Sequence, residues 1–147
     1  MRKLILIVLV SVVCIIGGFY WGSNQANATL TDNITTKKQV DDFTLHIRIE
    51  KIDDGFQVFR SIQYTGDESV EIEHQTPLVS VSLKNKNHDF TGSNVTKVLG
   101  EGNSYYPQNA KVFTSQEEGE YPIYFHARFT VNGECFEIEH VHELILE

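Results

Sequence analysis

The pattern of apolar and polar positions predicts that the chain ends in a long β-hairpin. Between Glu117 and Glu147, two alternating runs flank the dipeptide Asn132-Gly133. Asn-Gly between alternating runs indicates a two-residue turn, because both of its residues must accept a positive φ. Such a turn pairs Val131 with Glu134 and thereby fixes the register of the whole hairpin.

This register divides the side chains of the hairpin between two faces. His126 falls opposite Glu139 on a polar face, which suits a surface in contact with water. The alternation fails near the end, because His140 and His142 fall on the apolar face, and we therefore expect a β-bulge near His140 or an irregular strand end. The apolar face, which is expected to form the core, carries Tyr121, Ile123, Phe125, Ala127, Phe129, Phe136 and Ile138.

The rest of the chain shows short alternating runs between turn signals, which is typical of an all-β protein. Strands are expected over 43–49, 56–64, 70–73, 78–83 and 105–113, with a further short apolar piece at 95–99. No stretch keeps a helical period. Counted with the hairpin, these runs predict an antiparallel β-sandwich of seven to eight strands.

The start of the hairpin carries the spacing of a tyrosine corner. In Gly119-Glu120-Tyr121, the tyrosine hydroxyl is expected to turn back to an upstream backbone group. The motif resembles that of immunoglobulin-like β-sandwiches, where the tyrosine precedes the second core cysteine by two residues. Ile123 holds that cysteine position, so the resemblance implies an Ig-like architecture without the inter-sheet disulfide.

A second resemblance extends along the chain. An early strand pair, the turn Tyr64-Thr65-Gly66-Asp67 and the late hairpin follow one another in an order similar to small secreted Ig-like domains of Gram-positive bacteria. The nearest named group is the intracellular-proteinase-inhibitor-like domains. The resemblance implies protease inhibition as one possible function, although no diagnostic reactive loop is present to carry it.

The N-terminal residues have the parts of a secretory signal peptide. Arg2 and Lys3 precede an apolar run over 4–16, and Ala26-Asn27-Ala28 fits the small-x-small cleavage rule. We expect a signal-peptide helix over 1–28, a flexible polar spacer over 29–42 and the sandwich domain over 43–147. An uncleaved anchor is the alternative, because 4–21 is about long enough to cross a bilayer. Either way the protein is expected to be secreted or extracytoplasmic, and it would contact the membrane only through an uncleaved N-terminal segment.

Charge and cysteine content narrow the classes of partner. The formal net charge of −8 disfavours nucleic acid and anionic membrane surfaces, and no Gly-rich phosphate loop occurs. Cleavage after Ala28 would leave Cys135 as the one cysteine, so an apolar core must supply the stability. The acidic neighbours Glu134 and Glu137 raise the pKa of a thiol and argue against Cys135 as a nucleophile.

Two groups of residues are candidates for a site. His140 and His142 project from one strand face, with His126 nearby, and imidazole suits Cu or Zn. The alternative, which we favour, is that these histidines are structural residues at a strand end. Tyr105 and Tyr106 are candidates for partner binding, because tyrosine is favoured at interfaces. Their alternative is that one ring enters the core and the other covers it.

These observations favour a binding module over an enzyme. No catalytic motif with a recognisable spacing occurs, and no resident cofactor is expected. We therefore expect a non-enzymatic extracytoplasmic module that binds a protein or another cell-envelope component. A Cu- or Zn-binding domain and a protease inhibitor-like domain are the alternatives.

Overall fold

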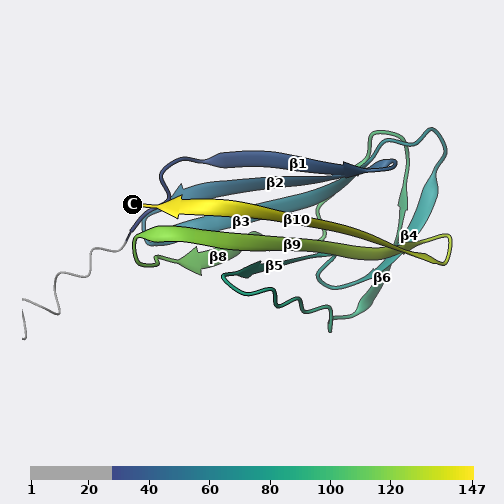
Figure 1. Ribbon diagram of the computed structural model, residues 1–147. Coiled ribbons are helices and arrows are strands. Elements are labelled where there is room, and N and C mark those ends of the chain that lie inside the picture. Colours follow the sequence, from purple (N-terminus) through teal and green to yellow (C-terminus); the bar gives the residue numbers. More distant parts are fainter. Residues whose placement is uncertain (1–27) are drawn as a thin grey trace, which may run out of the picture.

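The computed structural model describes residues 28–147, which form an antiparallel β-sandwich of two sheets (Figure 1). The all-β sandwich expected from the sequence is confirmed. Apart from Ala28, the expected signal peptide lies outside the described residues. Within 28–147, no helix has the length and apolar content needed to cross a membrane.

Each sheet has five strands, so the described residues form ten strands rather than seven or eight. Sheet 1 contains β1 (Ile34–Val40), β2 (Phe43–Ile52), β3 (Gly55–Tyr64), β7 (Ser104–Tyr105) and β8 (Lys111–Thr114). Sheet 2 contains β4 (Val70–Gln75), β5 (Val79–Leu83), β6 (Asn94–Leu99), β9 (Gly119–Val131) and β10 (Glu134–Leu146).

The strand order places β3 and β9 at the centres of the two sheets. In sheet 1 the order is β1-β2-β3, and both β7 and β8 pair with the far side of β3. In sheet 2 the order is β10-β9-β4-β6, and β5 also pairs with β9. The strands β4 and β5 follow one another along the same side of β9, separated at Pro77, because proline cannot donate to the ladder.

The expected register of the C-terminal hairpin is confirmed from Val131↔Glu134 to Gly119↔Leu146. The turn residues Asn132 and Gly133 have φ values of 52° and 86°, as a two-residue turn of this kind requires. The expected bulge near His140 or irregular strand end is wrong, because the pairing continues without interruption past His140 to Leu146.

The two histidines stay on the inner face because β10 is the edge strand of sheet 2. His140 and His142 are half-buried, whereas Leu144 and Leu146 on the same face are buried. An edge position leaves the imidazoles partly in contact with water, so no shift in register is needed to expose them. Inward-pointing polar side chains also discourage a foreign strand from pairing with an open edge.

The tyrosine corner forms as expected. The hydroxyl of Tyr121 donates a hydrogen bond of 2.9 Å to the backbone carbonyl of Glu117. The ammonium of Lys84 lies 4.5 Å from the centre of the same ring. The corner therefore ties the backbone just before β9 to the first residues of that strand.

A cluster of aromatic rings joins the two sheets beside the hairpin turn. Phe43 of sheet 1 lies 4.9 Å from Phe129 and 5.0 Å from Phe136 of sheet 2, between ring centres. Its ring also lies 5.1 Å from Tyr64.

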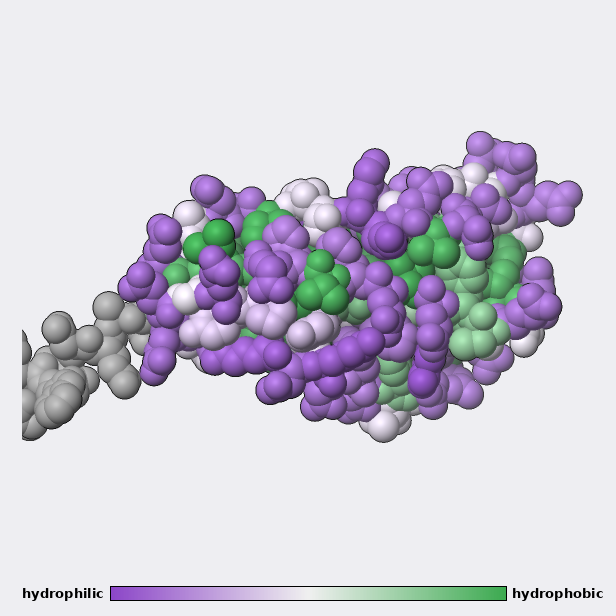
Figure 2. Space-filling model, in the orientation of Figure 1, coloured by the Kyte–Doolittle hydropathy of each residue, from purple (hydrophilic) through white to green (hydrophobic). Residues whose placement is uncertain are grey.

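On the outside, hydrophilic side chains cover most of the face in Figure 2, and hydrophobic side chains reach that surface in separate patches.

The expected flexible spacer over 29–42 is wrong, because this segment belongs to the sandwich. Leu30 is 1% exposed, and Ile34–Val40 forms β1. The backbone of Thr29 exchanges hydrogen bonds of 2.8 and 3.0 Å with Glu147, beyond the end of β10. Pattern analysis missed β1 because its apolar residues stand only at its two ends, as suits a half-exposed edge strand.

Two cations from sheet 1 occupy the side of the sandwich next to β5. The guanidinium of buried Arg60 donates to the carbonyl oxygens of Val79 and Asn109, at 3.2 and 2.7 Å. The ammonium of Lys111 donates to the carbonyl oxygen of Val81 at 2.7 Å. Burial lowers the pKa of Arg60 to about 10, so it remains charged at neutral pH. The bonds to Val79 and Val81 satisfy carbonyl groups of β5, which pairs with no further strand beyond β9 within the described residues.

The burial of Leu30 generates a prediction about the segment expected to be a spacer. Leu30→Ala should lower the free energy of unfolding by about 2–5 kcal/mol, because it removes a buried side chain and leaves a cavity. Lys37→Ala, at an exposed position of β1, is the control and should change it by less than about 0.5 kcal/mol. Urea unfolding measures both, and an unchanged Leu30→Ala protein would contradict the packing described.

Candidate functional site

The outer face of sheet 1 carries a hollow of about 350 Å³, which we call the sheet 1 hollow. Ligand sites of about 300–1,000 Å³ are typical for small molecules, so its size is at the lower end of that range. The residues that line it are Thr35, His46, Ile47, Arg48, Phe59, Arg60, Ser61, Gln63, Ser104 and Tyr106.

The register of β1, β2 and β3 sets the polar floor of this hollow. Arg48 pairs with Thr35 on one side and Phe59 on the other, and His46 pairs with Ser61. Phe59 and Ser61 point outward, because Arg60 between them reaches inward to β5. Their partners across the sheet therefore also lie on the outer face. Ser61 is only 2% exposed although it lies on the outer face, so its neighbours enclose it.

Two aromatic rings give the hollow its apolar character. Tyr106 follows β7 directly and is 68% exposed. Phe59 is half-buried, and the guanidinium of Arg48 lies 4.5 Å from the centre of its ring. The same guanidinium pairs with Glu50 at 3.2 Å, which holds it over the ring. The ring of Tyr106 is therefore free, whereas the guanidinium of Arg48 covers the ring of Phe59.

A row of hydrogen bonds fixes the polar groups of the hollow. Gln63 donates through Nε2 to the carbonyl oxygen of Gly102 at 3.5 Å, which leaves its Oε1 as an acceptor. Nε2 of His46 lies 2.9 Å from that Oε1 and must therefore carry the proton of the bond. The arrangement holds both side chains in place before any ligand arrives, and this lowers the entropy cost of binding.

The hollow differs sharply in charge from the opposite face of the molecule. No aspartate or glutamate lines it, although the chain has 20 acidic residues. The outer face of sheet 2, by contrast, carries Glu71, Glu73, Glu120, Glu137, Glu139 and Glu143. A ligand with negative charge would therefore be repelled by sheet 2 and tolerated at sheet 1.

The structure separates the two tyrosines that the sequence suggested for partner binding. Tyr105 packs against the core, and its hydroxyl lies 3.1 Å from Nε2 of the buried His74. Tyr106 lines the sheet 1 hollow and is exposed. Only the second ring is therefore available to a partner.

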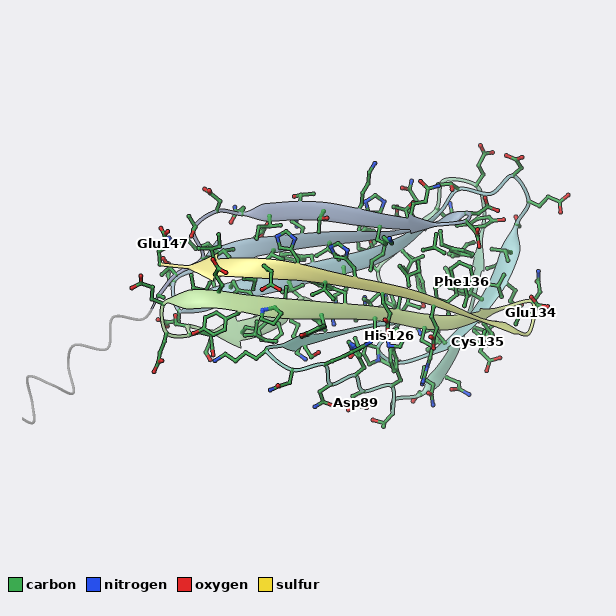
Figure 3. All side chains as sticks on the ribbon, viewed as in Figure 1. Asp89, His126, Glu134, Cys135, Phe136 and Glu147 are labelled. Atoms are coloured by element: carbon green, nitrogen blue, oxygen red, sulfur yellow. The ribbon has the colours of Figure 1, made fainter. Side chains whose placement is uncertain are left out.

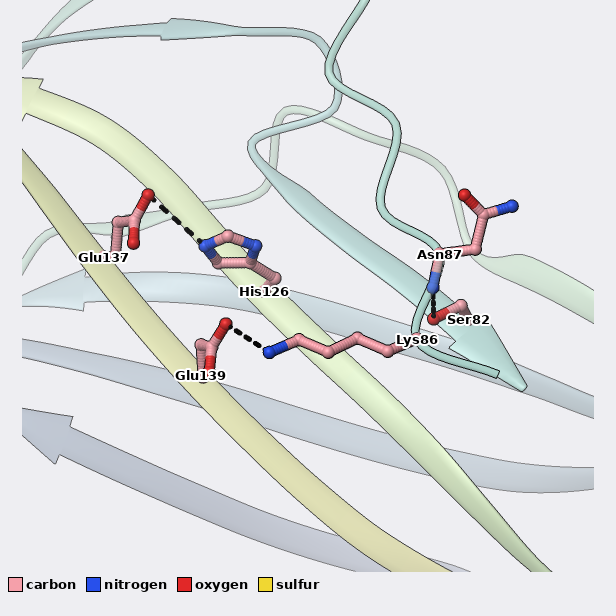
Figure 4. Close-up of polar contacts among 6 residues, drawn as sticks. All are labelled: Ser82, Lys86, Asn87, His126, Glu137 and Glu139. Atoms are coloured by element: carbon pink, nitrogen blue, oxygen red, sulfur yellow. Dashed lines mark hydrogen bonds and ion pairs between the residues drawn. The ribbon is translucent and has the colours of Figure 1, made fainter. Parts of the chain in front are cut away.

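The three histidines suggested as metal ligands are divided between two faces. His140 and His142 lie on the inner face with ring centres 6.4 Å apart. His126 lies on the outer face of sheet 2, 4.9 Å from His88 between ring centres and 3.6 Å from Glu137 between Nε2 and Oε1 (Figures 3 and 4). No group of three or more His, Cys, Asp or Glu residues able to hold a metal ion occurs within 28–147. The Cu or Zn alternative therefore has no assembled set of ligands in this part of the chain.

The loop between β5 and β6 lies along sheet 2 and covers His126. The hydroxyls of Ser82 and Ser80 accept hydrogen bonds from the backbone N–H groups of Asn87 and Asp89, at 3.2 and 3.3 Å. Lys86 pairs with Glu139 at 2.8 Å (Figure 4).

Aromatic contacts also hold this loop against β9. The buried ring of Phe90 lies 5.2 Å from the ring of His126, measured between ring centres. The guanidinium of Arg128, on β9, lies 4.3 Å from the centre of the Phe90 ring. The loop thus forms part of the packed structure rather than a free end loop for a partner.

Sequence reasoning missed most of the residues of the sheet 1 hollow. A usable signal was present in β3, where the apolar Phe59 and the charged Arg60 stand in the wrong phase for a strand with an apolar inner face. This phase places the ring of Phe59 on the outer face of sheet 1 and the guanidinium of Arg60 on its inner face. Nothing in the pattern of β2 distinguished His46 and Arg48 from ordinary polar positions.

Comparison with known proteins gives no relative for this chain. No protein-family model matches it, and neither a curated protein nor a solved structure matches it.

The half-buried His140 predicts a loss of stability in mild acid. Burial, with smaller effects of His142 and Lys38, lowers the pKa of His140 below its ordinary value of 6.5. The unfolded chain then takes up a proton that the folded chain disfavours, so the free energy of unfolding falls as the pH drops below about 6.5.

Urea unfolding at about pH 7.5 and about pH 5.5, above the range in which most carboxylates titrate, measures this effect. The His140→Gln protein should lose less stability over that interval than the unchanged protein does. An equal loss in the two proteins would contradict the assignment to His140.

Proposed function

We propose that this protein is a non-enzymatic extracytoplasmic binding module that holds a protein or another cell-envelope component on the outer face of sheet 1. The observation that carries the proposal is the sheet 1 hollow, with its exposed Tyr106 ring and its pre-oriented His46 and Gln63. Binding sites commonly combine an apolar surface with a few fixed polar groups of this kind.

The chemistry of the hollow favours binding over catalysis. Ser61 and His46 stand opposite one another, but Nε2 of His46 is engaged by Gln63. A serine nucleophile needs a base that a third group orients, and no carboxylate lines this hollow to do so. Its polar groups are placed to hold a ligand.

The arrangement of strands supports an immunoglobulin-like scaffold. The order β2-β3-β8 facing β10-β9-β4-β6 corresponds to strands A-B-E facing G-F-C-C′ of that fold. The Tyr121 corner stands at the start of the strand that corresponds to F. Such sandwiches present sheet faces and loops to partners while the core stays rigid.

The N-terminal sequence supplies the expected location. Its charged start, its apolar run and its Ala26-Asn27-Ala28 site fit export across a membrane. A module delivered in this way meets the components of the cell envelope first, which is why the proposal names them as partners.

The exposed ring of Tyr106 provides the test of this function. Tyr106→Ala should weaken binding to isolated envelopes of the host cell by about 5–30-fold, since a central aromatic side chain can contribute about 1–2 kcal/mol or more. Tyr124→Ala removes the same kind of ring from the outer face of sheet 2 and should leave binding unchanged. Co-sedimentation of the purified protein with the envelopes gives the affinities.

Both variants should unfold at nearly the same urea concentration as the unchanged protein, because neither ring is buried. Equal envelope binding by the Tyr106→Ala and the unchanged protein would contradict the proposed site. A loss of binding in the Tyr124→Ala protein alone would move the site to sheet 2.

A further inference from the structure

We propose that the ligand of the sheet 1 hollow is a glycan chain of the cell envelope, an inference that rests on the proposed binding function. The residues that line the hollow offer the exposed ring of Tyr106, the ring of Phe59 beneath Arg48, and hydroxyl, amide and imidazole groups. Sugar rings present C–H groups to the electron-rich faces of aromatic rings, and their hydroxyl groups require partners that both donate and accept. The hollow supplies both kinds of contact on one surface.

The neutral polar groups of the hollow match the hydrogen bonds of a sugar. The exposed Thr35 and Ser104 bring hydroxyls, which donate and accept, and the fixed Gln63 brings an amide. The imidazole of His46, which Gln63 holds through Nε2, adds its Nδ1 as a further polar group. A ligand whose groups are themselves both donors and acceptors can satisfy this mixture.

The size of the apolar contact favours a glycan over a folded protein. A stable protein interface buries about 800 Å² on each partner around an apolar centre. Here the exposed large apolar side chains of the face are Tyr106 in the hollow and Val112 outside it, and the outward positions Lys37 and Gln39 of β1 are polar. One exposed ring beside a small polar hollow suits a chain that contacts the surface over a few sugar units.

The backbone of this face also argues against an extended peptide. Peptides that add to a sheet bond to its free edge, where backbone groups are unpaired. The centre of the hollow lies over β2 and β3, which are paired with one another along their whole length. A ligand there is held through side chains, as a glycan would be.

The charge of the hollow fits envelope glycans that carry carboxylate or phosphate groups. No acidic residue lines it, Lys37 supplies positive charge on this face, and the guanidinium of Arg48 is paired with Glu50 beside the hollow. The acidic outer face of sheet 2 would repel the same chains. The charge distribution therefore directs an anionic or neutral glycan to sheet 1.

The test uses the full chain and three preparations of host cell walls: untreated walls, walls stripped of protein by protease, and soluble glycan strands released from the stripped walls by a muramidase. The unchanged protein should co-sediment with the first two equally well, and the soluble strands should compete for it. Tyr106→Ala should lose at least about fivefold in affinity for the stripped walls.

A second variant tests the fixed amide. Gln63→Glu replaces the Nε2 donor by a carboxylate of the same shape and should also weaken binding to stripped walls. Gln75→Glu is its matched control, because Gln75 lies in sheet 2 with its Oε1 3.1 Å from Arg128, where a carboxylate is favourable. Urea unfolding establishes that each variant is folded.

The outcomes separate this inference from the proposed function. Binding that depends on Tyr106 with untreated walls but disappears after protease treatment overturns the glycan and retains the binding module. Competition by the soluble strands, lost in Tyr106→Ala and in Gln63→Glu but not in Gln75→Glu, supports the glycan. No Tyr106-dependent binding to any preparation overturns both proposals.

Discussion

The register of the β9–β10 hairpin is the constraint on which the rest of this structure depends. β9 pairs with β10 on one side and with β4 and β5 on the other, so its phase decides the inner face of all of sheet 2. A slip by one residue would turn Phe129 outward and bring Arg128 into the core. The Asn132-Gly133 turn and the Tyr121 corner hold the two ends of β9, and Phe43 of sheet 1 packs on the face thus defined.

The sandwich closes its two long sides with polar side chains. Beside β5, the cations of Arg60 and Lys111 bond to strand carbonyls, which no further strand covers in the described part of the chain. Between the edges β1 and β10, His140 and His142 remain half-buried on the inner face. Within the described residues, both sides are therefore blocked by polar side chains and not by a disulfide.

The sequence predicted what local rules determine. The hairpin turn, its register and the Tyr121 corner depend on residues close together in the chain, and all three are confirmed. Leu30 and β1 were missed, because their burial comes from strands distant in the sequence. The sheet 1 hollow was reached only through Tyr106, since it needs three strands and the segment after β7 to come together. The inverted phase of Phe59 and Arg60 was the one local sign of it.

The proposed function requires that the outer face of sheet 1 binds the ligand while the outer face of sheet 2 does not. Backbone amide chemical shifts of the isotope-labelled protein, titrated with soluble cell-wall glycan strands, test this claim most directly because they report on every strand at once. We expect the largest changes at the outward positions of β2 and β3 and in the segment from Gly102 to Tyr106. Changes concentrated on the outward positions of β9 and β10 would contradict it.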